Sequence, residues 1–469
     1  MIKDFATIDF ETYYDKDYTL KKIQTDAYVL DERFEIIGVS AKAGHYSEPE
    51  WFSGEERHVK EFLQDTIDWS TTPVCAQFTQ FDGFICTQRL GLKPKMWMDT
   101  LSMARMHYPY LMSHSLKNMA EHLGIGQKGT QVESYMGYRR EDFTTDELAD
   151  YGGYCDNDTA LTHTIAELLL DRTPLLELYL IDMTIRMFTE PHLLGDTERF
   201  KAYYESEIRR KEELVASSGV DKSQLMSNPQ FADLLIDAGV VPPTKQSPTT
   251  GRTTWAFART DEGFTDLLDH ASEEVRRLVE ARLGVKSSIA ETRALRFVEA
   301  SQRGAMPVFL SHWGAKTTGR LSGGNKMNWQ NLPARGSAKE IRNCIRAPDG
   351  YKCVVGDSSN IELRFAMVMA GQTDAIEQIK HYDALGDEAD SDLYCDFSTK
   401  LHGRVITNTE ADYKERFIGK VAMLSLQYSS AHVTFMNMLR NLAGIIVTEN
   451  EAKRIVNLYR RTFEKLEIW

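Results

Sequence analysis

Long apolar runs and paired cysteines are both missing from the sequence. None of its apolar runs approaches the roughly 20 residues that a membrane-spanning helix needs, and residues 1–5 lack the charged-then-apolar pattern of a secretion signal. The six cysteines include no CxxC pair, which argues against a zinc ribbon or a disulfide framework. We therefore expect a soluble protein with reduced thiols and no membrane contact, located in the cytoplasm.

Positive charge is also in short supply. The chain has 55 Lys and Arg against 69 Asp and Glu, a formal net charge of -14, which argues against a protein that coats nucleic acid indiscriminately. An enzyme with a local basic groove remains possible. The 469 residues, 42% of them hydrophobic, exceed what one core usually organises, so we expect two or three domains rather than one small binding module.

The first 175 residues alternate between strand-like and helix-like stretches. Short β-branched or aromatic runs predict strands, and apolar residues at helical spacing predict helices. The strands are expected at 6–13, 35–40 and 74–78, and the helices at 55–68, 115–123 and 144–171. Residues 1–175 are thus predicted to form an α/β domain.

Helical patterns dominate residues 176–305, where they are interrupted at 241–251 by a stretch with the composition of a loop. The helices are expected at 175–190, 198–217, 229–238 and 287–302. Residues 306–469 change character again: a Gly/Asn/Gln-rich stretch precedes an apolar strand at 352–356 and several helices. We therefore predict three domains, at 1–175, 176–305 and 306–469.

Four acidic residues and a tyrosine stand at informative places in the first domain. Asp9 and Glu11 lie two apart on a predicted strand and so share one face. Asp82 follows the strand at 74–78, and Tyr154 and Asp158 lie four apart on a predicted helix. Each pattern alone has an ordinary explanation, such as a solvated pair or a helix cap. Their combination supplies hard oxygen ligands for divalent ions.

This order of motifs resembles the 3′-to-5′ exonuclease domain attached to DNA polymerases, whose pattern is DxE, then FD, then YxxxD. The resemblance covers most of residues 1–175 and implies a ribonuclease H-like mixed sheet flanked by helices. It implies two Mg²⁺ or Mn²⁺ ions, one held by Asp9, Glu11 and Asp158 and the other by Asp9 and Asp82, with Tyr154 and Glu11 orienting the attacking water. The family's usual His-Asn is replaced by Gln77-Phe78, which puts contacts to the terminal nucleotide in doubt.

A second group of motifs lies beyond residue 305. Residues 317–346 contain six Lys or Arg against one acid, Glu340, which indicates a local phosphate-binding surface. Asp357 follows the predicted strand at 352–356. On a later predicted helix a stripe of residues at intervals of four suits a nucleoside triphosphate, with cations for phosphates and a flat ring for the base: Arg416, Lys420, Leu424 and Tyr428.

These pieces in this order resemble family A, or DNA polymerase I-type, DNA polymerases of a phage-like kind. The matching segments are Thr318–Ser322 with Gln330-Asn331, Asp357–Arg364, and Arg416–Tyr428. The resemblance implies a helical thumb at 176–305 and part of an α+β palm with fingers at 306–469. Asp357 would bind two Mg²⁺ ions, Glu362 would exclude a ribose, and Arg416 and Lys420 would hold the dNTP.

The resemblance further implies that primer-template DNA is tracked along its minor groove by Arg320, Gln330 and Asn331. Departures from the family pattern include Leu424, Ser429, Ser358 and Asn360. The largest is an absence, because no His-Asp-Glu motif with the second palm carboxylate follows the fingers. Two-metal nucleotidyl transfer needs both carboxylates, so a split polymerase completed by a second chain and a shortened sequence both fit.

The expected function is template-directed DNA synthesis in replication or repair, with 3′-to-5′ proofreading on single-stranded 3′ ends. One alternative is a 3′-to-5′ exonuclease whose polymerase-like part grips DNA without extending it, but the retained triphosphate stripe argues against this. A non-enzymatic DNA-binding replication module is the other alternative, and it would not require the complete set of carboxylates.

Overall fold

The structure is a computed structural model that describes residues 2, 4–247, 250–259, 261–333, 337–386 and 389–468. The chain forms two compact units, residues 1–353 and 354–469. The boundaries expected near residues 175 and 305 both fall within the first unit. In the part of the chain that the structure describes, no helix is both long and apolar enough to cross a membrane.

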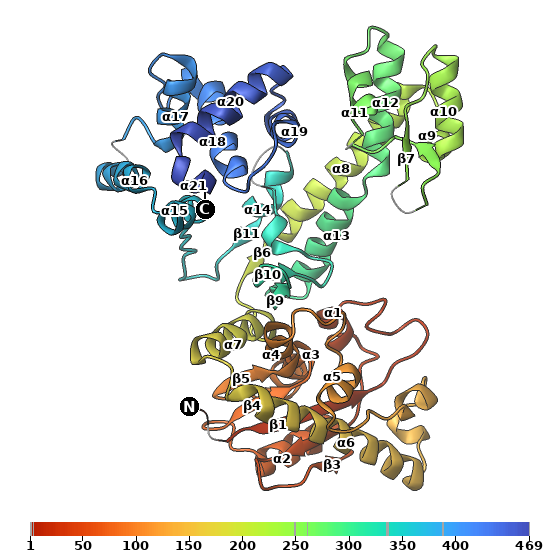
Figure 1. Cartoon of the computed structure of the whole chain (residues 1–469). Coiled ribbons are helices and arrows are strands. Elements are labelled where there is room, and N and C mark those ends of the chain that lie inside the picture. The colour runs from red at the N-terminus through yellow and green to blue at the C-terminus, as the bar shows by residue number, and fades with distance from the viewer. Residues whose placement is uncertain are drawn as a thin grey trace. The chain divides into compact units, whose positions relative to one another are not determined.

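A mixed five-stranded sheet organises the N-terminal part of the first unit (Figure 1). Its order is β3-β2-β1-β4-β5, with β1 and β2 antiparallel, β2 and β3 antiparallel, and β1, β4 and β5 parallel. β1 and β2 are buried along nearly their whole length, as expected for central strands covered on both faces. The strands are β1 (Ala6–Thr12), β2 (Ile36–Lys42), β3 (Glu50–Phe52), β4 (Pro73–Ala76) and β5 (Met96–Asp99).

Helices cover this sheet. The longest, α6 (Thr145–Leu170), begins with a capping box in which Thr144 and Glu147 satisfy each other's backbone amides, and it packs along β1 and β2. The others are α1 (Thr25–Val29), α2 (Glu56–Thr66), α3 (Thr79–Ile85), α4 (Thr100–His107), α5 (Leu116–Leu123) and α7 (Leu175–Thr189). The hydrophobic core under the sheet takes in Ile181, Ile185 and Phe188 of α7.

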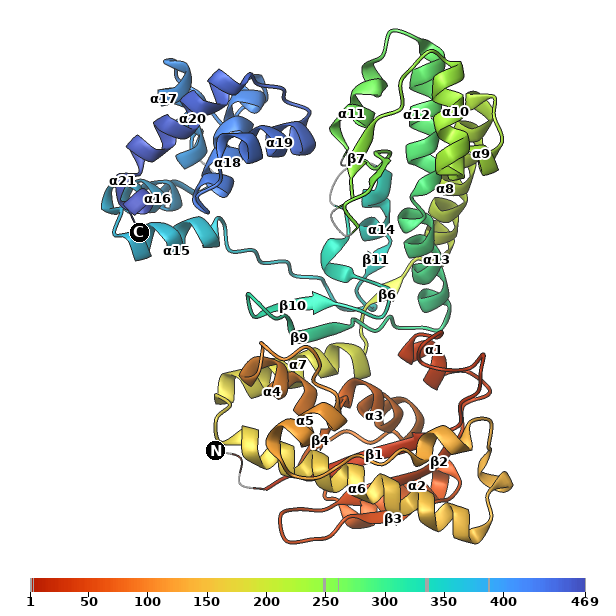
Figure 2. The same cartoon turned by 45° about the vertical axis from the view of Figure 1, so that its right-hand side comes forward.

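The rest of the first unit is largely a bundle built around α8 (Thr197–Ser218), which packs against α12 (Glu273–Lys286) and α13 (Ile289–Gln302) (Figure 2). Shorter helices complete it: α9 (Lys222–Met226), α10 (Asn228–Asp237), α11 (Glu262–Thr265) and α14 (Glu340–Asn343). The stretch 241–251, expected to be a loop, contains β7 (Thr244–Gln246), which pairs with β8 (Thr253–Trp255) just beyond it. Two further pairs are β9 (Leu310–Ala315) with β10 (Arg320–Gly323), and β6 (Leu194–Gly195) with β11 (Ile345–Arg346).

The second unit contains helices and, among its described residues, no strand. The helices are α15 (Ile361–Ala370), α16 (Thr373–Leu385), α17 (Leu393–His402), α18 (Tyr413–Leu426), α19 (His432–Ala443), α20 (Glu449–Thr462) and α21 (Glu464–Ile468). The strand expected at 352–356 is wrong for this structure: residues 351–358 have no regular structure, and Val354 is 95% exposed. A strand needs hydrogen-bonded neighbours, and the described residues supply none here.

Candidate functional site

The four acidic residues predicted in the first domain come together beside the middle of the sheet. Asp9 and Glu11 project from one face of β1 toward α6, which carries Asp158. Asp82 lies on α3, and its Oδ1 accepts a hydrogen bond of 3.2 Å from the Phe10 backbone amide between the two strand carboxylates. Glu11, Asp82 and Asp158 are buried, and Asp9 is half-buried.

Burial raises the pKa values of all four carboxyl groups, and for Asp9, Glu11 and Asp82 the charge of a neighbouring carboxylate adds to the shift. Burial, followed by the charge of Asp158, raises the pKa of Asp9 to about 7. Burial, followed by the charge of Asp9, raises the pKa of Glu11 to about 8. The pKa of Asp82 lies well above its usual range for the same two reasons, burial and then Asp9. Such displaced pKa values are typical of functional sites.

Two tyrosines of α6 border the cluster. The hydroxyl of Tyr151 donates a hydrogen bond of 2.5 Å to Glu11 Oε2. The buried ring of Tyr154, which the sequence predicts as a site residue, stacks on Tyr151 with 5.9 Å between the ring centroids. Sequence analysis missed Tyr151, although its spacing of three from Tyr154 places both on one helix face.

Lys128 is a second site residue that the sequence did not reveal. Its ammonium group forms an ion pair with Asp158 Oδ2 and lies 5.0 Å from the centroid of the Tyr154 ring. Its charge opposes the upward shift that burial imposes on the pKa of Asp158. Lys128 lies in a segment without helix or strand between α5 and α6, so no periodic pattern could place it.

The cluster fits divalent metal ions. Its donors are carboxylate oxygens, the ligands that Mg²⁺ and Mn²⁺ prefer. Asp158 Oδ1 is buried and has no hydrogen-bond partner, so one ligand atom is available to a cation. Ligand atoms of Asp9, Glu11 and Cys155 also lie within 4.8 Å of one another. Lys128 supplies only one positive charge to this group of acids.

The raised pKa values predict an unusual dependence of stability on pH. Because Asp9 and Glu11 bind protons more tightly when folded than when unfolded, their contribution to the free energy of unfolding is greatest below about pH 4. It is lost as the pH rises through about 7 and 8. In metal-free buffer, the melting temperature of the wild type should therefore fall more between pH 4 and 8 than that of Glu11→Gln. Added Mg²⁺ should raise the melting temperature of the wild type most at pH 8. Parallel pH profiles for the two proteins would contradict these pKa shifts.

The residues that replace the family's His-Asn have structural contacts. The amide of Gln77 donates to the His114 carbonyl oxygen at 2.9 Å and its side-chain oxygen accepts from the Thr100 hydroxyl. The ring centroid of Phe78 lies 6.2 Å from that of Phe309. Gln77 thus links β4 to the neighbouring chain segments, which accounts for a polar side chain at this position.

In the second unit, one pocket gathers three of the predicted polymerase residues: Asp357, Arg416 and Lys420. Arg416 Nε donates to Asp392 at 3.0 Å, and its guanidinium carbon lies 5.6 Å from the centroid of the Tyr394 ring. Opposite charges also line the pocket where Arg364 pairs with Asp383 at 2.6 Å. Asp357 itself is exposed.

The predicted stripe of four residues is only partly helical. Arg416, Lys420 and Leu424 lie on α18, but this helix ends at Leu426 and Tyr428 lies in the following turn. Ser429, at the position of the family's glycine, has a positive φ of 56°, a conformation that glycine adopts more easily. The hydroxyl of the exposed Tyr428 donates to Glu362 Oε2 at 2.7 Å, so these two predicted residues are in contact. Leu424 is half-buried.

The predicted DNA-tracking residues belong to the first unit and are exposed. Arg320 begins β10, and Gln330 and Asn331 lie in a short 3₁₀ turn at Trp329–Asn331. Arg293 donates to the Asn331 carbonyl oxygen at 3.0 Å, which holds this turn against α13. One basic residue of the segment, Arg335, lies outside the described residues.

Comparison with known proteins identifies the family to which the chain belongs. The profile described as DNA polymerase family A matches residues 196–469, more than half of the chain. The chain belongs to DNA polymerase family A. Members of this family are nucleotidyltransferases that use divalent metal ions. The matched region includes Asp357 and α18 and excludes the carboxylate cluster.

The chain also resembles one curated relative and one solved structure. A DNA polymerase of Escherichia phage T5 is 26% identical over 170 residues, which are 33% of this family A chain and 19% of that protein. The chain therefore spans about a fifth of this relative's length. Among solved structures, the polymerase domain of Pol1 from M. smegmatis, in complex with DNA primer-template and dNTP, has a TM-score of 0.61 at 16% identity. That match covers 99% of this chain and 73% of the other, and it shows a shared fold.

Proposed function

We propose that this family A chain serves template-directed DNA synthesis and that its N-terminal sheet domain removes nucleotides from DNA 3′ ends. The observation that carries the second activity is the cluster of buried, incompletely neutralised carboxylates at Asp9, Glu11, Asp82 and Asp158. Burial of several like charges without compensation is costly, so an arrangement of this kind is best explained by a requirement for divalent ions.

The ions would be held by the same carboxylates, and when bound they supply a nucleophilic water and neutralise charge on the leaving 3′ oxygen. The protein groups have their own tasks. Glu11, fixed by the Tyr151 hydroxyl, and Tyr154 would orient the attacking water on the side of α6. Lys128 would contribute a positive charge beside Asp158, where the negatively charged phosphodiester approaches.

The polymerase activity rests on family membership and on the pocket of the second unit. Arg416 and Lys420 line this pocket with Asp357, a combination suited to a triphosphate and a divalent ion. The Tyr428–Glu362 hydrogen bond would fix the residue proposed to exclude a ribose 2′-hydroxyl. Primer-template DNA, single-stranded 3′ ends and dNTPs are thus the proposed partners. The alternative in which the second unit only grips DNA leaves the triphosphate-binding residues unexplained.

The exonuclease proposal can be tested with a primer labelled at its 5′ end that carries a mismatched 3′ nucleotide. With Mg²⁺ present, we expect a ladder of products shortened one nucleotide at a time, and no products in EDTA. A phosphorothioate at the last linkage should slow the reaction, whereas the same modification at the 5′ end should not. Internal cuts, or a label released as a single nucleotide from the 5′ end, would contradict the proposal.

A further inference from the structure

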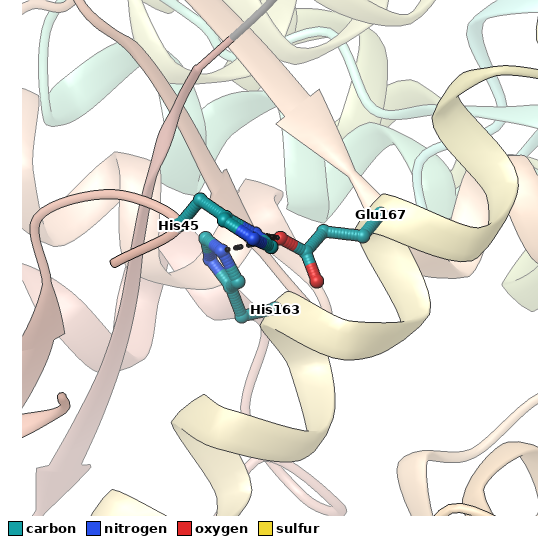
Figure 3. Close-up of side chains that lie close together, drawn as sticks. All are labelled: His45, His163 and Glu167. Atoms are coloured by element: carbon teal, nitrogen blue, oxygen red, sulfur yellow. Dashed lines mark hydrogen bonds and ion pairs between the residues drawn. The ribbon is translucent and has the colours of Figure 1, made fainter. Parts of the chain in front are cut away.

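Two histidines and a glutamate meet on the part of α6 that follows the carboxylate cluster (Figure 3). His163 and Glu167 lie one turn apart on this helix. His45 reaches them from the turn between β2 and β3. One potential ligand atom from each of the three side chains lies within 4.8 Å of the others, and His45 Nδ1 contacts Glu167 Oε1.

His163 is the central residue of this cluster, because one of its buried ring nitrogens has no hydrogen-bond partner. The side chain is 3% exposed and its ring stacks on Phe5 with 4.5 Å between centroids. Its Nδ1 is 2.8 Å from the hydroxyl of Thr7. Its Nε2 is 3.4 Å from Glu167 Oε1 but has no hydrogen-bond partner. A buried polar atom without a partner is uncommon and requires an explanation.

We propose that His45, His163 and Glu167 bind a divalent transition-metal ion of the Zn²⁺ type. Two imidazoles and one carboxylate are a known ligand set for zinc, with a fourth position left for water. The Thr7 contact to Nδ1 matches the outer hydrogen bond that normally orients a ligating histidine.

The site is chemically different from the carboxylate cluster. That cluster offers mainly oxygens, which suit Mg²⁺ and Mn²⁺, whereas imidazole nitrogen favours zinc-like ions. Lys42 is the neighbouring cation that opposes metal binding, and its ammonium group is turned to the carbonyl oxygens of His45 and Ser47. Glu167 supplies a compensating negative charge. A bound ion would fasten the turn that carries His45 to the helix that carries Asp158.

Co²⁺ is a suitable probe, because it replaces Zn²⁺ and gives visible absorption bands that report its ligands. We would titrate the whole chain with Co²⁺ in excess Mg²⁺, which saturates the carboxylate cluster. The wild type should bind one ion with visible bands and without the near-ultraviolet band of a cobalt–thiolate bond. His45→Ala and Glu167→Gln should each weaken binding at least about tenfold, and Thr7→Val should weaken it about 10–100-fold through the outer hydrogen bond.

Exposed His58 of α2 provides the matched control, and His58→Ala should bind Co²⁺ as the wild type does. Because the His45 side chain is 58% exposed, His45→Ala should fold normally, which unchanged metal-free thermal unfolding would verify. Equal Co²⁺ affinity in the wild type and in folded His45→Ala would overturn the proposal. A cobalt–thiolate band in all variants would also overturn it, since a cysteine rather than the two histidines and Glu167 would then hold the ion.

Discussion

Replacing Asp9 with alanine should lower the rate of 3′-end shortening by about 10³-fold or more, equivalent to about 4 kcal/mol of transition-state stabilisation. Asp9 interacts electrostatically with two other carboxylates of the cluster, because its charge raises the pKa values of both Glu11 and Asp82. Its removal would therefore disturb the ligands of both proposed ions. Single-turnover rates on a 3′-mismatched primer measure the effect without interference from product release.

Asp156→Asn is the matched control for this variant. Asp156 lies on α6 two residues before Asp158, but its carboxylate accepts a hydrogen bond of 2.6 Å from Ser40 and stands outside the cluster. We expect it to retain near wild-type activity. Metal-free thermal unfolding should show Asp9→Ala at least as stable as the wild type, because a repelled charge has been removed. Similar rates for Asp9→Ala and wild type would eliminate the assigned metal site.

The second large effect concerns DNA synthesis. The chain of residues 1–469 with Asp9→Ala should bind primer-template and yet leave the primer at its original length when Mg²⁺ and dNTPs are added. The sequence predicts that residues 1–469 contain Asp357 without the second palm carboxylate that the family resemblance implies, and nucleotidyl transfer needs two ions held in register. The wild-type chain under the same conditions should only shorten the primer.

Fluorescence anisotropy with labelled primer-template separates loss of binding from loss of chemistry. Arg320→Ala should weaken binding, and the effect should shrink at high salt, because a phosphate or groove contact depends on ionic strength. Asp357→Ala should bind DNA as tightly as its parent. If Asp9→Ala extends the primer, and Asp357→Ala in that background abolishes the extension, the prediction is wrong and another group of the chain holds the second ion.

The sequence was most informative where local patterns determine structure. The apolar spacing in α6 predicts a helix that places Tyr154 and Asp158 on one face, and the strand pattern in β1 does the same for Asp9 and Glu11. The strand pattern predicted an α/β domain, and the resemblance to 3′-to-5′ exonuclease domains implied the mixed sheet. Its two edge strands, β3 and β5, were not predicted, since Glu50–Phe52 and Met96–Asp99 are too short to show a period.

The missed features depend on tertiary contacts. Lys128 reaches Asp158 from a segment with no periodicity, and His45 joins His163 across more than a hundred residues. The predicted strand at 352–356 failed for a related reason, because its apolar residues suit a strand only where other strands pair with it. The stripe from Arg416 to Tyr428 continued past Leu426 because spacing alone does not show where a helix ends.

The central claim, that the buried carboxylates form a two-metal centre, is tested most directly by anomalous diffraction from a crystal soaked in Mn²⁺. The account predicts two anomalous peaks among the carboxylates of Asp9, Glu11, Asp82 and Asp158, with Lys128 withdrawn from Asp158, and their loss in Asp9→Ala. A crystal at neutral pH with no peak at this cluster, and with Lys128 still paired to Asp158, would contradict it.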